Sequence, residues 1–161
     1  MSKSEELKAI ATAPGANRFF PNSEISAIEN CGNPQRLEEL AADPAHGARV
    51  EPKGLHEAVI GLALEEKGDL VGAITRDPRP DGGEFIDGQG KVWDVKSFRS
   101  GISPKKGGFE LKKDLDKIDN ELQKGEGVIV DTTFLSPSDA ATLQQGVQDR
   151  GWSNNQVKWY P

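Results

Sequence analysis

A glycine-rich reversal between two short apolar runs constrains this chain more than any other sequence feature. Gly88-Gln89-Gly90 separates residues 84–86 from residues 92–98, and such a separation is typical of a β-hairpin. Folding the hairpin about its central residue predicts that Glu84 lies opposite Asp94 on the neighbouring strand. The hairpin is therefore expected to bring two carboxylates together.

Glu84, Asp94 and Lys96 are expected on one face of this hairpin, because side chains alternate along a strand. Two like charges that face each other repel and cost stability, so the acid pair needs a compensating partner. A divalent cation is the usual partner, since its charge makes adjacent carboxylates favourable. Lys96 would then lie beside whatever the metal binds. The alternative is a solvated charged face on which Lys96 screens the acids.

The chain has 161 residues, which is the length of one ordinary domain. No apolar run approaches the roughly 18 residues of a membrane span, and no apolar segment follows a basic start. We therefore expect neither a membrane span nor a signal peptide. Cys31 is the only cysteine, which excludes an internal disulfide and a zinc site built from cysteines. The net charge of −6 argues against a general binder of polyanions.

A basic segment nevertheless follows the hairpin directly. Residues 91–113 contain seven lysines and arginines against two acids. Such a segment could hold a phosphate backbone, whereas the alternative is an ordinary solvated loop. The candidate nucleic-acid-binding residues are Arg99, Lys105, Lys106, Lys112 and Lys113.

Residues 1–53 are predicted to form a small helical lead-in, and residues 54–161 the main domain. Helical fragments at residues 4–12, 24–30 and 34–42 are separated by proline and glycine pairs, which break helices. No catalytic pattern appears in this N-terminal part.

A stronger helix is predicted over residues 55–67, with Gly68 as its C-terminal cap. Glu57 falls on an apolar row of this helix, and a carboxylate among aliphatic positions is costly unless it is paired or metal-bound. Glu57 is therefore a candidate site residue, with Glu65 second. The alternative is that a glutamate in the first turn simply favours the helix dipole.

The remaining pattern alternates strands with helices. Residues 127–134 form a near-continuous apolar run of the kind that is buried within a sheet, and with the elements around it they indicate a βαβ unit. Asp131, Thr132 and Thr133 lie toward the end of this strand, where such sheets place functional residues, and a structural role is the equal alternative. The other predicted elements are a strand at 69–75, helices at 109–124 and 140–150, and a strand at 156–160.

The order of these elements resembles the restriction-endonuclease-like core of the PD-(D/E)xK nuclease superfamily. Glu57, an acid before the turn, and Asp94-Val95-Lys96 after it carry the resemblance. Asp81 matches the middle acid by letter, in Pro80-Asp81, while Glu84 matches it by hairpin geometry and is preferred. The resemblance implies an α/β fold with a central mixed sheet flanked by helices.

Within that superfamily, residues 84–97 are similar to C-terminal toxin domains of bacterial contact-dependent growth inhibition systems and related polymorphic toxins. Residues 128–133 fit the same comparison, which covers residues 54–161 and leaves residues 1–53 unmatched. This resemblance implies a toxin that is secreted or surface-delivered as the C-terminal part of a larger bacterial effector. It would act in the target-cell cytoplasm, and a cognate immunity protein would block it.

The implied activity is metal-dependent hydrolysis of phosphodiester bonds in DNA or tRNA. The implied catalytic residues are Glu57, Glu84, Asp94 and Lys96, and the metal ligands are Glu84, Asp94, the Val95 carbonyl and Glu57. Magnesium or manganese suits all-oxygen ligation, and a mixed zinc site is the alternative. The rival function is a non-enzymatic interaction module or an immunity-type partner built on the same fold. The acidic net charge favours this rival, whereas the shared face of the hairpin opposes it.

Overall fold

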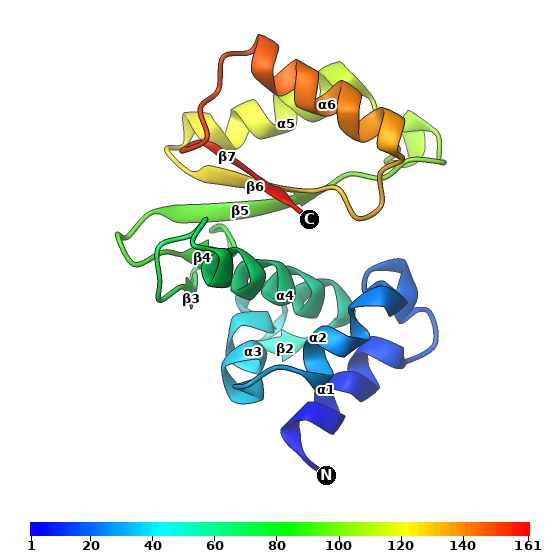
Figure 1. Cartoon of the computed structure of the whole chain (residues 1–161), viewed down its shortest axis with the longest axis vertical. Coiled ribbons are helices and arrows are strands. Elements are labelled where there is room, and N and C mark those ends of the chain that lie inside the picture. The colour runs from blue at the N-terminus through cyan, green and yellow to red at the C-terminus, as the bar shows by residue number, and fades with distance from the viewer. The chain divides into compact units, whose positions relative to one another are not determined.

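The computed structural model describes all 161 residues, and the chain divides into two compact units, Met1–Gly90 and Lys91–Pro161. Their helices and strands are labelled in Figure 1. The predicted domain boundary between residues 53 and 54 stays a prediction. The helix Pro52–Lys67 spans it and belongs to the same compact unit as the N-terminal segment. None of the helices is long and apolar enough to cross a bilayer.

The first unit is mainly helical, as the sequence predicts. Asn33 caps the third helix by accepting a hydrogen bond from the Arg36 amide at 3.1 Å, and Gly68 ends the fourth helix in the left-handed conformation at φ 82°. Both predicted ends are confirmed. The α-helices are α1 (Lys3–Thr12), α2 (Ile25–Glu29), α3 (Pro34–Ala41) and α4 (Pro52–Lys67), and the 3-10 turns are η1 (Ala16–Arg18), η2 (Asn22–Glu24) and η3 (Pro44–His46).

Two short antiparallel strand pairs complete this unit. They are β1 (Ala42–Asp43) with β2 (Arg49–Val50), and β3 (Thr75–Arg76) with β4 (Phe85–Ile86). The helix α4 comes close to the second pair at Gly61, where an added Cβ would lie 2.8 Å from the Phe85 ring and 3.0 Å from Ile74. Glycine at this position therefore allows the helix to approach the strands.

The predicted strand at residues 69–75 is wrong over most of its length, because only Thr75 continues into a strand. At Ile74, side chains and not a neighbouring strand supply the hydrogen-bond partners of the backbone. The Ile74 amide donates to Glu65 Oε2 at 2.7 Å, and the Ile74 carbonyl accepts from Arg36 at 3.1 Å. Leu70 and Ile74 are nonetheless buried. The apolar pattern therefore predicted correctly which residues are buried, but not that the backbone forms a strand.

The second unit alternates strands and helices, and its parallel pairing confirms the predicted βαβ unit. β6 pairs in parallel with β5 and with β7, and Figure 1 shows α5 and α6 above these strands. A single apolar core joins both helices to β6 and includes Ile118, Leu143 and Val130. The elements are β5 (Val92–Ser97), η4 (Pro104–Lys106), α5 (Leu111–Gln123), β6 (Gly127–Asp131), α6 (Pro137–Asp149) and β7 (Val157–Tyr160).

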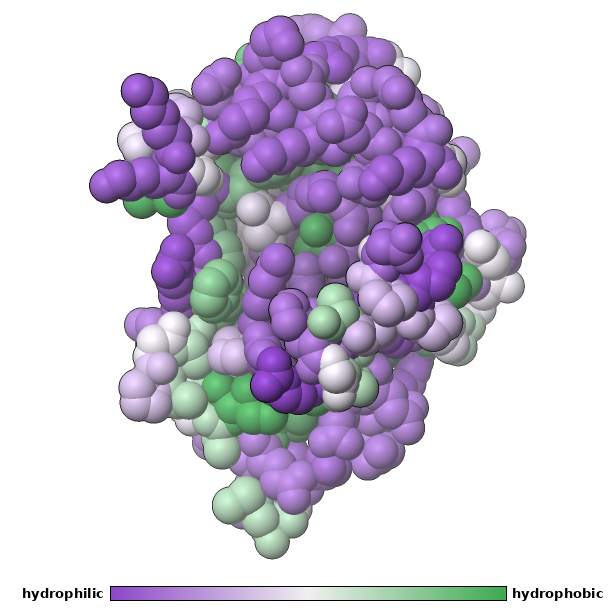
Figure 2. All heavy atoms as spheres, turned by 180° about the vertical axis from the view of Figure 1, so that it is seen from behind, coloured by the Kyte–Doolittle hydropathy of each residue, from purple (hydrophilic) through white to green (hydrophobic).

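The predicted α/β class is thus confirmed, with strand pairs of both orientations and helices in both units. Hydrophilic residues predominate on the face of the molecule in Figure 2, where the hydrophobic residues form small patches. The nuclease core that the sequence resembles is a finer assignment and stays a prediction.

Alanine at Gly127 is expected to lower the free energy of unfolding by about 1–3 kcal/mol, because the added Cβ overpacks the sheet. Gly127 lies opposite Trp93, and a Cβ there would stand 2.5 Å from two atoms of the indole ring. This clash outweighs the roughly 0.5–1 kcal/mol by which alanine is ordinarily favoured over glycine in a strand. Urea unfolding measures the loss, and the cost of Gly127→Ala should be smaller in a Trp93→Leu background, where the indole ring is absent. Equal stability of Gly127→Ala and the unmodified protein would contradict the packing described.

Candidate active site

Asp94 and Lys96 lie side by side on β5, as the strand period predicts. Lys96 Nζ is 2.8 Å from Asp94 Oδ2, and Asp94 is only 8% exposed. In the parallel register, Asp94 is opposite Val128 and Lys96 is opposite Val130. Both valines belong to the core under α5 and α6, so the two charged residues occupy the helix-covered face of β5.

Glu121 of α5 completes a cluster of three charged side chains. Its Oε1 lies 3.4 Å from Lys96 Nζ, and its side chain is 15% exposed. The sequence reading missed this residue. The signal was present, because Glu121 lies three residues after Ile118 of the apolar stripe and therefore next to it on the helix surface, much as Glu57 falls on an apolar row of α4. Lys96 is therefore held between a strand acid and a helix acid within one unit.

One oxygen of Asp94 has an unusual environment. Asp94 Oδ2 is buried, and the cation that it contacts is the Lys96 ammonium at 2.8 Å. Buried carboxylate oxygens normally accept hydrogen bonds or contact a cation. A buried carboxylate of this kind is also a suitable ligand for a hard divalent cation, whose preferred ligands are oxygen atoms.

Glu84 and Asp81 both belong to the first unit, and the structure distinguishes them. The Glu84 carbonyl accepts from the Asp77 amide at 3.0 Å, which extends the β3–β4 pairing by one residue and fixes Glu84 at the strand end. Asp81 is exposed at the tip of the intervening loop. Between Asp87 and Gly90, a turn hydrogen bond of 3.0 Å and a left-handed Gly90 make the predicted reversal. The facing of Glu84 and Asp94 stays a prediction.

Asp77 organises the loop that leads to Glu84. It is completely buried and accepts hydrogen bonds from the amides of Arg79 and Gly83 and from the Arg79 guanidinium. The Arg79 side chain, together with these amides, holds the pKa of the Asp77 carboxyl below its usual range. Sequence reading treated this loop as irregular and missed Asp77. The Asp-Pro start of the loop was the available signal.

Glu57 is buried on α4, as predicted, with 7% of its surface exposed. Phe85 is the β4 residue that packs against this helix, at Gly61. The convergence of Glu57 with Glu84 stays a prediction.

The candidate nucleic-acid-binding residues differ in whether contacts within the protein hold their side chains. Arg99 stacks on the Phe134 ring at 4.2 Å from its centroid, and Lys113 donates to the carbonyls of Pro104 and Gly108. These contacts fold the loop between β5 and α5. Three candidates remain on the surface: Lys112, which pairs with Asp116 at 2.8 Å, and Lys105 and Lys106, which are exposed.

Asp131 at the end of β6 has a structural role. It is fully buried and accepts hydrogen bonds from Ser97 Oγ at 2.6 Å, from the Thr133 amide at 3.0 Å and from the Thr133 hydroxyl. The carboxylate thus joins the ends of β5 and β6 and caps the chain as it leaves the sheet. Of the two sequence alternatives, these contacts favour the structural one.

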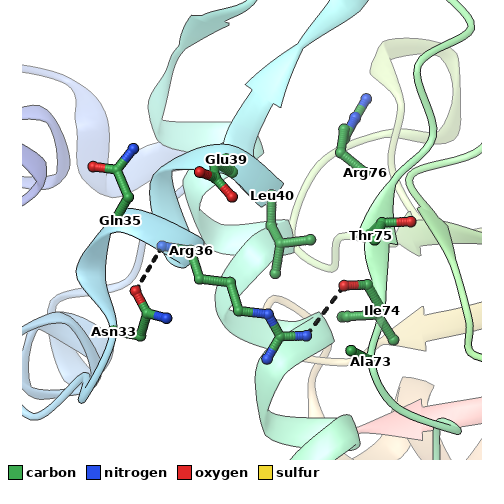
Figure 3. A pocket seen from close by; sticks show the side chains of 9 residues that line it. All are labelled: Asn33, Gln35, Arg36, Glu39, Leu40, Ala73, Ile74, Thr75 and Arg76. Carbon is green, nitrogen blue, oxygen red and sulfur yellow. Dashed lines mark hydrogen bonds between the residues drawn. The ribbon is translucent and has the colours of Figure 1, made fainter.

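A separate cavity of about 330 Å³ lies in the first unit between α3 and residues 73–76 (Figure 3). Arg36 crosses its base, pairs with both carboxylate oxygens of Glu65 at 2.5 and 2.6 Å, and donates to the Ile74 carbonyl. This bidentate pairing holds the pKa of Glu65 below its usual range. Glu65, the second helix acid that the sequence singled out, therefore anchors structure. No predicted catalytic residue lines this cavity.

Neither unit by itself gathers three or more histidine, cysteine, aspartate or glutamate side chains into a group that could hold a metal ion. Comparisons with protein-family models, with curated proteins and with solved structures gave no match.

Proposed function

We propose that the protein is a metal-dependent nuclease whose active site is built on Asp94 and Lys96. The observation that carries the proposal is the buried Asp94 carboxylate, whose Oδ2 lies 2.8 Å from the Lys96 ammonium on the same face of β5. An acid and a lysine two residues apart on one strand face are the minimum that the acid-x-Lys motif requires. Asp94-Val95-Lys96 has this arrangement.

Asp94 and Glu84 would hold one magnesium or manganese ion, with the Val95 carbonyl as a further oxygen ligand. Such an ion supplies Lewis acidity and positive charge when it is bound. The turn hydrogen bond between Asp87 and Gly90 and the left-handed Gly90 support the pairing of these acids, because such a turn is typical of a short hairpin loop. A loop of this kind would place Glu84 opposite Asp94.

Lys96 would orient the attacking water and stabilise the negative charge that develops on the phosphate. Glu121 is the positioning residue for this lysine, because it draws the ammonium from the α5 side. Glu57 would complete the shell or hold a second ion. The surface lysines Lys105, Lys106 and Lys112 would contact the phosphate backbone, together with Arg99 and Lys113.

The substrate class that fits is DNA or tRNA, and the resemblance extends the proposal to a bacterial growth-inhibition toxin with a cognate immunity protein. The net charge of −6 limits non-specific affinity, so binding is expected to depend on the local basic segment and to weaken steeply with salt.

Incubating the full chain with plasmid DNA and with total tRNA tests the proposal. Cleavage of at least one of them is expected with magnesium or manganese, and none with chelator. The isosteric Asp94→Asn variant serves as the matched control, since it keeps shape and loses the metal-binding charge. Folded, intact protein that cuts neither substrate with any divalent metal would contradict the proposal.

One observation favours the rival interaction module. The Lys96 ammonium is placed between two carboxylates, which is also the arrangement of a purely structural ion cluster. Calorimetric titration with manganese separates the two functions. A scaffold has no reason to bind the ion through Asp94, whereas the nuclease binds it and Asp94→Asn does not.

A further inference from the structure

The second unit has a surface groove whose lining contains none of the residues of the Asp94 cluster. It has a volume of about 320 Å³, within the range of small-ligand pockets, and lies where α6 and the segment after it meet β7. Two of the three tryptophans of the chain, Trp152 and Trp159, line it. Both rings are half-buried and pack against the core of the unit, so that each is held in place while part of it faces the groove.

Amide side chains surround these rings. Gln144, Gln148 and Asn154 line the same groove, and none of their side chains makes a hydrogen bond within the protein. Gln144 and Gln148 are four residues apart on α6, so they lie on the same helix face. Each amide offers two donors and one acceptor oxygen. The groove thus combines flat aromatic surface with uncommitted donors and acceptors.

The lining contains no charged side chain. A positive charge stands close by, because the Arg150 guanidinium lies 5.4 Å from the centre of the Trp152 ring and also pairs with Asp116 at 3.2 Å. The part of a ligand that fits inside the groove is therefore neutral and flat, with hydrogen-bonding groups on its edge. The part of the ligand that lies outside the groove, near Arg150, would be negatively charged.

We propose that this groove is a subsite for one base of single-stranded nucleic acid. Bases stack on tryptophan whatever their sequence, and the amides of glutamine and asparagine match the donor and acceptor pairs on base edges. Arg150 then meets the adjoining phosphate. The choice of a nucleic-acid base as ligand rests on the proposed nuclease function, since the groove would hold substrate beyond the cleavage site.

Fluorescence anisotropy with labelled 12-nucleotide single strands of RNA and DNA tests this subsite on the full chain, in chelator so that nothing is cut. The probes are intact strands and an abasic strand of equal length and charge. Trp152→Leu keeps an apolar side chain against the core and removes the aromatic face, whereas Trp152→Phe keeps an aromatic ring. Thermal melts establish that each variant is folded.

The unmodified protein is expected to bind intact strands roughly tenfold or more tightly than the abasic strand. Trp152→Leu should lose this preference, and Trp152→Phe should retain most of it. A Gln144→Ala, Gln148→Ala double variant should weaken binding by a smaller factor. Equal binding of intact and abasic strands overturns the proposal. A Trp152→Leu variant that keeps the full preference for intact strands also overturns it. Trp152-dependent binding of a neutral hexasaccharide in place of the strands also overturns it, and identifies a saccharide site.

The proposed nuclease activity and the proposed base subsite can be tested independently of each other. Lys96→Met should slow cleavage by roughly a hundredfold or more and leave the preference for intact over abasic strands unchanged. Base-dependent binding without cleavage by the unmodified protein would keep the subsite and refute the nuclease. Cleavage by a protein that binds intact and abasic strands equally would support the nuclease and refute the subsite.

Discussion

Replacing Lys96 by methionine is expected to slow nucleic-acid cleavage by roughly a hundredfold or more, the scale of losing one preorganised group that stabilises transition-state charge. Methionine keeps an apolar stem of similar length and removes the ammonium that lies 2.8 Å from Asp94. The first-order rate of cleavage, measured at saturating magnesium or manganese, gives the effect. Asp94→Asn should show a loss of similar size, because the metal-binding charge disappears.

Two further variants make this result specific. Lys117 is an exposed lysine on the same helix as Glu121 and makes no ion pair, so Lys117→Ala should cut at the unmodified rate. Glu121→Gln should reduce the rate by a smaller factor, about tenfold, because the residue acts only through Lys96. If folded Lys96→Met cuts as fast as Lys117→Ala, the assignment of Lys96 is wrong.

Replacing Asp77 by alanine is expected to lower the free energy of unfolding by about 2–4 kcal/mol, the largest stability effect that we predict. The change removes four hydrogen bonds to a completely buried carboxylate and leaves the amides of Arg79 and Gly83 without their partner. The ion pair with Arg79 contributes only a small part of this loss, because the Arg79 side chain is 56% exposed and solvent screens its charge. Urea unfolding measures the change. Asp81→Ala, at an exposed position of the same loop, should change stability by less than about 0.5 kcal/mol.

The same carboxylate predicts a pH dependence of stability. The Arg79 side chain and the loop amides hold the pKa of Asp77 below its ordinary value of 3.8. A group whose pKa is lowered on folding contributes stability above its unfolded pKa, and this contribution disappears as the pH falls toward the folded pKa. The unmodified protein should therefore lose stability more steeply below about pH 4 than Asp77→Asn does. Parallel acid limbs for the two proteins would show that Asp77 is not stabilised as described.

Local rules predicted the helices and the shared face of β5 correctly. Asn33, Gly68 and Ser136 mark helix ends through contacts within a few residues, and capping chemistry is readable from such short segments. The period of a strand places Asp94 and Lys96 together without any knowledge of the rest of the fold.

Contacts between distant segments were not readable in this way. Glu121 meets Lys96 across 25 residues of sequence, so the third member of the charged cluster depends on how α5 packs on the sheet. Residues 69–75 were predicted to form a strand because they are apolar. The backbone groups of Ile74 instead make hydrogen bonds with the side chains of Arg36 and Glu65, which are 38 and 9 residues away in sequence. Tertiary partners overrode local propensity there.

The most direct test of the proposed site is a crystal of the full chain soaked in manganese, with the ion located by its anomalous scattering. We expect one manganese ion within roughly 2.0–2.4 Å of an Asp94 carboxylate oxygen, with Glu84 in the same coordination shell and Lys96 alongside. A saturated crystal without manganese at Asp94 would contradict the account. So would one in which the Glu84 and Asp94 carboxylates are too far apart to share an ion.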